Sequence, residues 1–217
     1  MTETLLLKKD LFGEIRLSGT GRRAEIVRDV APASPAIRWL ARALLRREAR
    51  ALAALDGVPG VPGIGRIERD RMTRSYLPGT PLHRARPADA HYFADAARLL
   101  RRMHRRDVVH NDLAKEPNLL VLDDGGPAFV DFQLAWHARR RGRLFRALAF
   151  EDIRHLLKHK RTYRPDLLTA RERRILENPG CLARTWRRTV KPAYLFVTRG
   201  LLGWADREGA ADRGSRS

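Results

Sequence analysis

Residues 110–132 read HNDLAKEPNLLVLDDGGPAFVDF, and this stretch decides which fold the chain can adopt. Two apolar segments flank the turn-forming run DDGG at 123–126, so the stretch predicts a β-hairpin. If the turn is centred on Asp124 and Gly125, Asn118 lies directly opposite Asp131. The two polar side chains at the open end of the hairpin are therefore expected to face each other.

This predicted pair of side chains suits a magnesium ion. Opposed residues on neighbouring strands have Cβ atoms roughly 4.5 to 5.5 Å apart, so an amide oxygen of Asn118 and a carboxylate of Asp131 can share one hard cation. Mg²⁺ keeps several positions for water and phosphate oxygens, so two protein ligands suit an ion that carries a nucleotide. Asp112 precedes this site by a short loop and could accept a proton from an incoming hydroxyl or orient that hydroxyl.

The residues before the hairpin predict a small antiparallel sheet with one helix. Strands are expected over 4–9, 14–18, 24–30 and, as a pair, within 66–76. A helix over 36–55 is expected between Ser34-Pro35 and Asp56-Gly57, which are typical start and stop signals. Its apolar stripe is predicted to consist of Ile37, Ala41, Leu44, Leu52 and Leu55.

Glu48 falls in the middle of that apolar stripe, where an ionised carboxylate is costly unless it has a partner. Arg28 lies on the same face of its strand as Ile26 and Val30. We therefore predict an Arg28–Glu48 ion pair between strand and helix. The alternative is that Glu48 lies at the edge of the helix and reaches water.

The rest of the chain predicts a second, mainly helical part. Helices are expected over 87–104, 147–159 and 169–177, and in the last apolar stretch, between Tyr194 and Trp204. That last stretch is read as a terminal core helix, with a membrane-surface helix as the alternative. His83, His91, His137, His155 and His159 show no spacing typical of a metal site and are read as surface or packing residues.

The charge of the chain restricts its partners. Lys and Arg total 44 against 25 Asp and Glu, a formal net charge of +19. This charge should draw the protein to phosphates of nucleotides, nucleic acids, anionic lipid or a phosphorylated polysaccharide, or it could be a solvated surface without a partner. The basic run at 139–143 could contact an anionic acceptor or a membrane surface, or it could be a solvated face. Cys181 is the only cysteine, and no apolar run is long enough to span a membrane, so a cytoplasmic protein is expected, with peripheral binding at the inner face of the membrane as an alternative.

The motif His-x-Asp-Leu at 110–113, the later Asn118 and Val-Asp-Phe at 130–132 together resemble the catalytic and metal-binding loops of the protein-kinase-like superfamily. Met103-His104, Val108-Val109 and the stretch 150–157 are also similar to RIO kinases, so the resemblance covers about residues 5–160. It implies an α+β fold of two lobes, with a small antiparallel sheet and one helix in the first lobe and a reduced, mainly helical second lobe. The implied boundaries are 1–76 for a nucleotide-binding lobe, 77–81 for a hinge, 82–205 for a catalytic lobe and 206–217 for a disordered tail.

The resemblance also implies a role for each matching residue. Asp112 corresponds to the catalytic aspartate, and Asn118 and Asp131 correspond to the metal ligands. His110 would brace the loop, and Asp152 resembles the helix aspartate that holds the backbone of this loop. The remaining assignments are nucleotide contacts by Gly13, Arg28 and Glu48, and a γ-phosphate contact by Lys115.

Several residues depart from the kinase pattern. The spacing from Asp112 to Asn118 is one residue longer, so the loop must bulge. Arg28 stands where the family has a lysine, for which Lys8 or Lys9 could substitute, and Gly13 is alone where the family has several glycines. Gln133 replaces the usual glycine of the metal loop, and Asn111 replaces the arginine that responds to activation-loop phosphorylation.

The resemblance therefore implies a kinase that uses ATP and Mg²⁺ to phosphorylate an acceptor hydroxyl. A protein serine or threonine is the first expectation, because of the RIO-like features. A sugar hydroxyl of lipopolysaccharide core is an alternative, since the basic surface suits an anionic glycolipid. A third reading, from another class, is a pseudokinase that acts as a basic binding module on RNA, ribosome or membrane.

Overall fold

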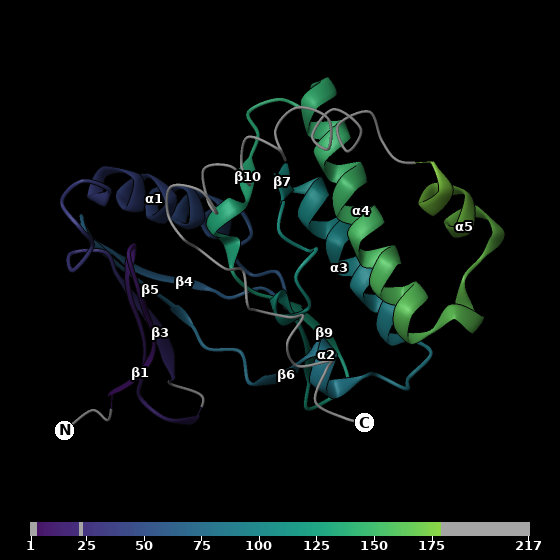
Figure 1. Cartoon of the computed structure of the whole chain (residues 1–217), viewed down its shortest axis with the longest axis horizontal. Coiled ribbons are helices and arrows are strands. Elements are labelled where there is room, and N and C mark those ends of the chain that lie inside the picture. Colours follow the sequence, from purple (N-terminus) through teal and green to yellow (C-terminus); the bar gives the residue numbers. More distant parts are fainter. Residues whose placement is uncertain (1–3, 22–23, 179–217) are drawn as a thin grey trace, which may run out of the picture.

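Five strands in the first third of the chain form one antiparallel sheet, as the sequence predicts. The computed structural model describes residues 4–21 and 24–178. The sheet has the order β1-β2-β3-β5-β4 (Figure 1). Its strands are β1 (Thr4–Asp10), β2 (Gly13–Ser18), β3 (Glu25–Asp29), β4 (Ile64–Ile67) and β5 (Arg71–Ser75).

One helix, α1 (Arg38–Ala54), lies beside this sheet (Figure 1). The predicted start at residue 36 is two residues too early, because the Ile37 backbone N–H donates to the Ser34 carbonyl and forms a turn there. The predicted stripe is also wrong at one position, since Leu45 is buried whereas Leu44 is half-buried. Glu48 is only 1% exposed, so it does face the sheet.

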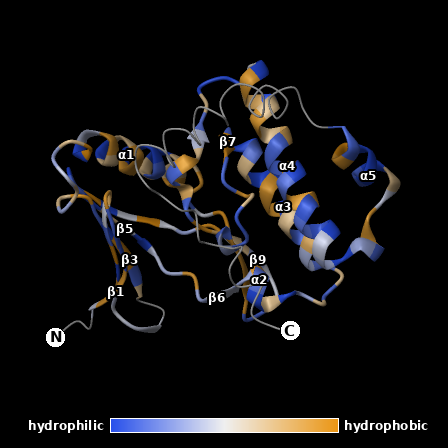
Figure 2. Ribbon diagram, in the orientation of Figure 1, coloured by the Kyte–Doolittle hydropathy of each residue, from blue (hydrophilic) through white to orange (hydrophobic). Residues whose placement is uncertain are grey.

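The second lobe is mainly helical. Its longest helices, α3 (Tyr92–Arg105) and α4 (Arg143–Tyr163), pack against each other, and each carries hydrophobic and hydrophilic residues around its circumference (Figure 2). Shorter elements complete the lobe: α2 (Leu82–Ala85), α5 (Ala170–Glu177), β6 (Gly79–Pro81), β7 (Val108–Val109) and β10 (Trp136–His137).

Two predicted helices begin at other residues. The helix expected from residue 87 begins at Tyr92, because the carboxylate of Asp89 accepts a hydrogen bond from the His91 backbone N–H at 2.7 Å and forms a turn there. The helix expected from residue 147 begins already at Arg143. The helix predicted over 169–177 agrees with α5 to within one residue.

The predicted hairpin is present, but its register differs from the prediction by one residue. Its strands are β8 (Leu119–Leu122) and β9 (Pro127–Phe129). Leu119 pairs with Phe129, and the Val130 backbone N–H donates to the Asn118 carbonyl at 3.0 Å. Asn118 is therefore opposite Val130, and the predicted pairing of Asn118 with Asp131 is wrong.

The cause of this shift lies in the turn. Gly125 has a φ of 79°, in the left-handed region that favours glycine, and its N–H donates to the Leu122 carbonyl at 2.9 Å. The Leu122 N–H in turn donates to the Gly126 carbonyl at 2.8 Å. The hairpin loop therefore has three residues, 123–125, and not the two residues that the sequence analysis assumed.

One hydrophobic core extends through both lobes. It joins Leu45 of α1 and Met72 of β5 to Met103 of α3, Phe129 of β9 and Leu156 of α4. The loops and helices of the second lobe are therefore packed directly on the underside of the first. Helix α1 makes this contact directly, because it lies against the turn at 132–134 and against β10.

Some predictions concern residues outside the described ranges. The terminal helix between Tyr194 and Trp204, the tail at 206–217 and Cys181 all lie there. The boundaries at 76, 81 and 205 stay predictions, although β6 occupies 79–81 and pairs with β8 of the second lobe. Among the described helices, none is long and apolar enough to cross a membrane.

Candidate active site

The loop at 110–118, between β7 and β8, is held by one buried carboxylate. Asp152 of α4 is 1% exposed and accepts hydrogen bonds from the backbone N–H groups of His110, at 2.8 Å, and Asn111, at 2.9 Å. Asn111 has a φ of 64° and its side chain donates to the Leu134 carbonyl at 3.0 Å. The start of the loop is therefore attached to the long helix of the second lobe.

His110 links this loop to the end of the hairpin. Its ring is fully buried, its Nε2 donates to the Val130 carbonyl at 3.0 Å, and its Nδ1 accepts from the Asp112 backbone N–H at 3.3 Å. Burial lowers the pKa of His110, which favours the neutral ring that this donor and acceptor pattern requires. His110 thus sets the position of the Asp112 backbone relative to β9.

Asp112 and Asn118 are in direct contact. The side-chain amide of Asn118 donates to the backbone carbonyl of Asp112 and to its Oδ2 atom, both at 2.9 Å. Lys115 Nζ lies 3.2 Å from the same Oδ2 atom. Burial raises the pKa of Asp112, and the negative charge of Asp131 also raises it, whereas Lys115 and Asn118 lower it.

The extra residue between Asp112 and Asn118 is absorbed by a short turn. The Lys115 N–H donates to the Asp112 carbonyl at 3.4 Å, and the Asn118 N–H donates to the Lys115 carbonyl at 3.1 Å. Residues 116–118 form a single turn of 3₁₀-helix that starts at Glu116-Pro117. The longer spacing therefore still brings the Asn118 amide to the Asp112 carboxylate.

Asp131 carries a buried carboxylate oxygen that has no donor. Its backbone is left-handed, with φ 63° and ψ 69°, and its Oδ1 atom has no hydrogen-bond partner among the described residues. A buried anionic oxygen without a donor is costly, and a cation would remove that cost. Because the Asn118 amide nitrogen is already bonded to Asp112, its oxygen is left to act as a ligand. Asp131 and Asn118 therefore fit a hard cation such as Mg²⁺.

Residues 4–21 and 24–178 do not form a closed protein cage for a metal ion. In the described parts of the chain, no three His, Cys, Asp or Glu side chains gather closely enough to hold one. An ion at Asp131 and Asn118 would need further oxygen ligands from water or from a bound phosphate. This is the coordination that Mg²⁺ has when it binds together with a nucleotide.

The predicted ion pair beneath the sheet is present, and a third residue joins it. Arg28 Nη1 lies 2.6 Å from Glu48 Oε2, and both side chains are at most 5% exposed. Arg74 Nε lies 3.4 Å from the other oxygen, Glu48 Oε1. Two guanidinium groups thus share one carboxylate, which leaves one positive charge in excess.

Arg74 was not predicted from the sequence, although its position on an inward strand face indicates a partner. Arg74 of β5 is the direct partner of Ile26 on β3, so it lies on the same inward face as Arg28. An arginine that alternates inward on the strand next to Arg28 could have suggested a shared partner. The pairing of β3 with β5 was needed to see it, because 46 residues separate these two arginines in the sequence.

The remaining candidates for nucleotide contacts, Lys8, Lys9 and Gly13, have structural roles in the β1–β2 hairpin. Lys8 and Lys9, proposed as substitutes for the missing lysine, form ion pairs with Asp10 and Glu14 at 3.5 and 3.1 Å on the exposed β1–β2 hairpin. Gly13 has a φ of 122°, and a Cβ atom there would lie 2.2 Å from the Asp29 carbonyl oxygen. The packing of β2 on β3 therefore already requires glycine at this position.

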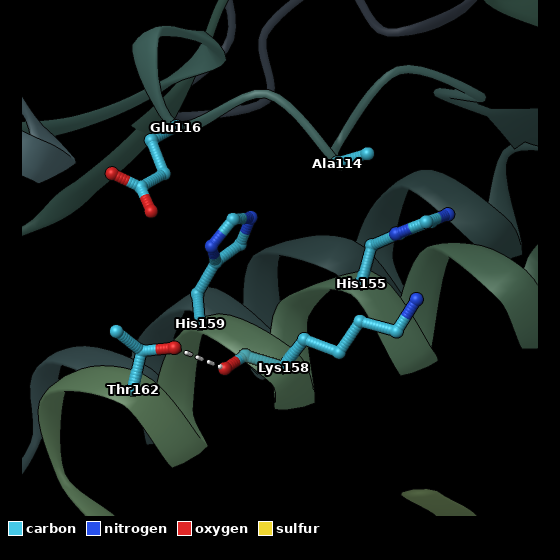
Figure 3. Close-up of a pocket in the computed structure, with 6 residues that line it drawn as sticks. All are labelled: Ala114, Glu116, His155, Lys158, His159 and Thr162. Carbon is cyan, nitrogen blue, oxygen red and sulfur yellow. Dashed lines mark hydrogen bonds between the residues drawn. The ribbon is translucent and has the colours of Figure 1, made fainter. Parts of the chain in front are cut away.

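A hollow of about 270 Å³ lies between the 110–118 loop and α4 (Figure 3). Its lining residues are Ala114, Glu116, His155, Lys158, His159 and Thr162. His159 Nε2 donates to the Leu113 carbonyl at 2.8 Å, and the Tyr163 hydroxyl donates to Glu116 at 2.8 Å. His155 and His159 are predicted as surface or packing residues, and His159 is indeed buried while His155 is half-buried. Both also line this hollow.

The histidines of this region predict acid destabilisation. Burial, followed by Lys158, lowers the pKa of His155 from 6.5 to about 4. In the unfolded chain His155 takes up a proton below about pH 6.5, whereas the folded protein does not until about pH 4, so unfolding becomes easier as the pH falls through this range. Burial also lowers the pKa values of His110 and His159, which adds to the effect.

We expect the stability of the variant His155→Gln to fall less than that of the wild type as the pH is lowered. Urea unfolding from pH 7 to pH 4 should show the free energy of unfolding falling less in the variant than in the wild type, by on the order of 3 kcal/mol. Parallel curves for the two proteins would show that folding does not lower the pKa of His155.

The fold of the chain is similar to that of a solved protein, although its sequence matches no known family. No protein-family model matches the chain, and none of the curated proteins matches it. Among solved structures, the crystal structure of the Rio2 kinase from Chaetomium thermophilum is similar, with a TM-score of 0.56 and 15% sequence identity. The match covers 82% of this chain and 62% of that chain. At this identity the likeness concerns the fold alone, and it shows that the chain has a two-lobed, protein-kinase-like α+β fold.

Proposed function

We propose that the chain is a phosphotransferase that uses ATP and Mg²⁺ to phosphorylate an acceptor hydroxyl, in the first place a serine or threonine of a protein. The observation that carries this proposal is the cluster of Asp112, Asn118 and Asp131. Asn118 is bonded to Asp112, and Asp131 adds a buried carboxylate oxygen without a donor. A kinase-like fold around such a cluster supports phosphoryl transfer, because this reaction depends on positioning and charge neutralisation.

The residues of the polar cluster would have different roles in phosphate transfer. Asp131 and the amide oxygen of Asn118 would hold the metal ion, which when bound neutralises charge on the phosphate oxygens. Asp112 orients the acceptor hydroxyl and takes its proton as the hydroxyl oxygen bonds to the γ-phosphorus and the bond to ADP breaks. The raised pKa of Asp112 makes it a stronger base than an exposed aspartate.

Cations around this cluster would bind the triphosphate. The excess positive charge of Arg28, Arg74 and Glu48 lies on the inner face of the sheet, where it attracts phosphate oxygens. Arg28 is oriented by Glu48 in the way that the family's lysine is expected to be. Lys115, which contacts the Asp112 carboxylate, would bind the γ-phosphate while Asp112 takes the proton.

The hollow beside the loop is the natural place for part of the acceptor (Figure 3). It is lined by Ala114 and Glu116 of the same loop that carries Asp112, so a group bound there lies close to the proton acceptor. The wall offers both donors and acceptors of hydrogen bonds, among them the ring of His155 and the carboxylate of Glu116. Either a peptide or a sugar can form hydrogen bonds with these donors and acceptors.

Transfer of label from [γ-³²P]ATP is the test of this proposal. The full chain with Mg²⁺ should label protein in a cell extract, and a chelator should abolish the label. Asp131→Asn should lower the rate roughly 100-fold or more, because a metal ion contributes several kcal/mol to transition-state stabilisation. In the same variant, Mg²⁺ should no longer add to the thermal stabilisation by ATP.

Other outcomes of this experiment would distinguish a sugar acceptor from a protein acceptor, and a binding module from an enzyme. Label found only in added lipopolysaccharide would replace the protein acceptor by a sugar hydroxyl. The chain is a binding module without catalytic activity if ATP and Mg²⁺ stabilise neither the wild type nor Asp131→Asn and no label is transferred from ATP. The replacement of lysine by Arg28 is the feature that would then explain the lost activity.

A further inference from the structure

Six exposed arginines surround the junction of α1, β10 and the start of α4. Within the described ranges, none of the six has an acidic partner: Arg46, Arg50, Arg139, Arg140, Arg143 and Arg146. We call these residues the basic surface. Figure 1 shows the three elements together at one edge of the molecule. Neighbouring basic residues outside this set are paired, for example Arg141 with Asp107 and Arg154 with Glu151.

The position of two of these arginines costs stability. Arg143 and Arg146 lie at the N-terminal end of α4, whose first turn contains no acidic residue. The helix macrodipole is positive at this end, so further positive charge is unfavourable there. An anion from outside the described structure would reverse this cost, because it would meet the arginines and the helix end together.

A hollow lined by both basic and apolar side chains opens within the basic surface. Its volume is about 360 Å³, and its lining residues are Arg47, Arg50, Trp136, His137, Leu144 and Leu148. Leu144 is 54% exposed, and the nearby Leu134 is 41% exposed. Arg47 donates to the carbonyls of Leu134 and Ala135, which fixes one wall of the hollow. The same surface therefore combines cations with exposed hydrocarbon.

This combination distinguishes between the anionic partners that could bind. A nucleic acid presents phosphates to arginine but gains little from exposed leucine side chains. An anionic bilayer presents phosphates at its surface and hydrocarbon just below. It can therefore bind both the arginines and the exposed leucine side chains. We propose that the basic surface docks this protein on a bilayer that contains anionic phospholipid, with Leu144 and Trp136 reaching toward the acyl chains.

Co-sedimentation with vesicles tests this docking. The full chain should bind vesicles of phosphatidylcholine mixed with phosphatidylglycerol, should not bind phosphatidylcholine alone, and should release as salt is added. The variant Arg50→Glu/Arg146→Glu should bind the anionic vesicles at least about 30-fold more weakly, because each basic residue near such a surface contributes about a factor of five. Both side chains are exposed and have no acidic partner in the described structure, so folding should not change.

A matched control carries the same change of charge elsewhere. Arg84 of α2 and Arg161 near the end of α4 are exposed and have no acidic partner among the described residues. Arg161 lies about 27 Å along the helix from Arg143, and α2 lies at the opposite edge of the molecule from β10 (Figure 1). Arg84→Glu/Arg161→Glu should therefore retain most of the binding.

Two further measurements keep the docking proposal separate from the proposed activity. Leu144→Ser should weaken binding roughly ten-fold without changing charge, because an apolar contact with the acyl region is lost. Asp112→Asn should bind vesicles like the wild type, even though it should transfer phosphate far more slowly. Equal vesicle binding by the basic-surface variant and its control would overturn the proposal, and so would wild-type protein that binds RNA but not anionic vesicles.

Discussion

Replacing Asp112 by asparagine should lower the rate of phosphate transfer by about 100- to 10,000-fold, the range expected when a proton acceptor is removed. Asparagine has nearly the same shape, so the contacts with Asn118 and Lys115 can persist in part. It cannot take a proton from the acceptor hydroxyl. The rate of label transfer from [γ-³²P]ATP at saturating ATP measures this effect.

A matched variant separates this chemical effect from a loss of charge or fold. Asp123 is exposed in the hairpin turn, so Asp123→Asn makes the same change of side chain away from the cluster. It should transfer phosphate at the wild-type rate. Asp112→Asn should still be stabilised by ATP and Mg²⁺, because Asp131 and Asn118 are unchanged. Wild-type turnover in Asp112→Asn would remove Asp112 from the mechanism.

Replacing Glu48 by leucine should lower the free energy of unfolding by about 3 to 5 kcal/mol, because the change leaves the buried Arg28 and the half-buried Arg74 without a counter-charge. Small domains have about 5 to 15 kcal/mol in total, so the variant would be close to unfolding. Arg28→Met should cost less, since Glu48 keeps Arg74 as a partner. Urea unfolding of the purified variants gives these values.

The triple variant Arg28→Met/Glu48→Leu/Arg74→Met is the control for this effect. It removes all the buried charge and fills the space with apolar side chains, so it should recover most of the stability lost in Glu48→Leu. It should not recover binding of ATP, because the cations of the nucleotide site are gone. An unchanged urea midpoint in Glu48→Leu would mean that the carboxylate is not buried against the arginines.

Sequence periodicity was sufficient to predict the elements that depend on local interactions. The strands of the first lobe, the pair within 66–76 and the helix that contains Glu48 all follow from alternating or helical spacing of apolar residues. The Arg28–Glu48 pair was also predictable, since an acidic residue in an apolar stripe and a basic residue on an inward strand face each require a partner. Helix starts were less accurate, because local turns such as that at Asp89 compete with the first helical turn.

By itself, the sequence determined the polar motif, the hairpin and the presence of two lobes, because these depend on residue type and short-range spacing. Only the tertiary structure decided how the motif is arranged. The left-handed Gly125 lengthens the hairpin loop and moves Asn118 out of register with Asp131, yet the turn at 116–118 brings Asn118 to Asp112. Arg74, the hollow at His155 and the basic surface each join residues from elements far apart in the chain. Such contacts depend on how strands and helices pack, and no short stretch of sequence specifies that packing.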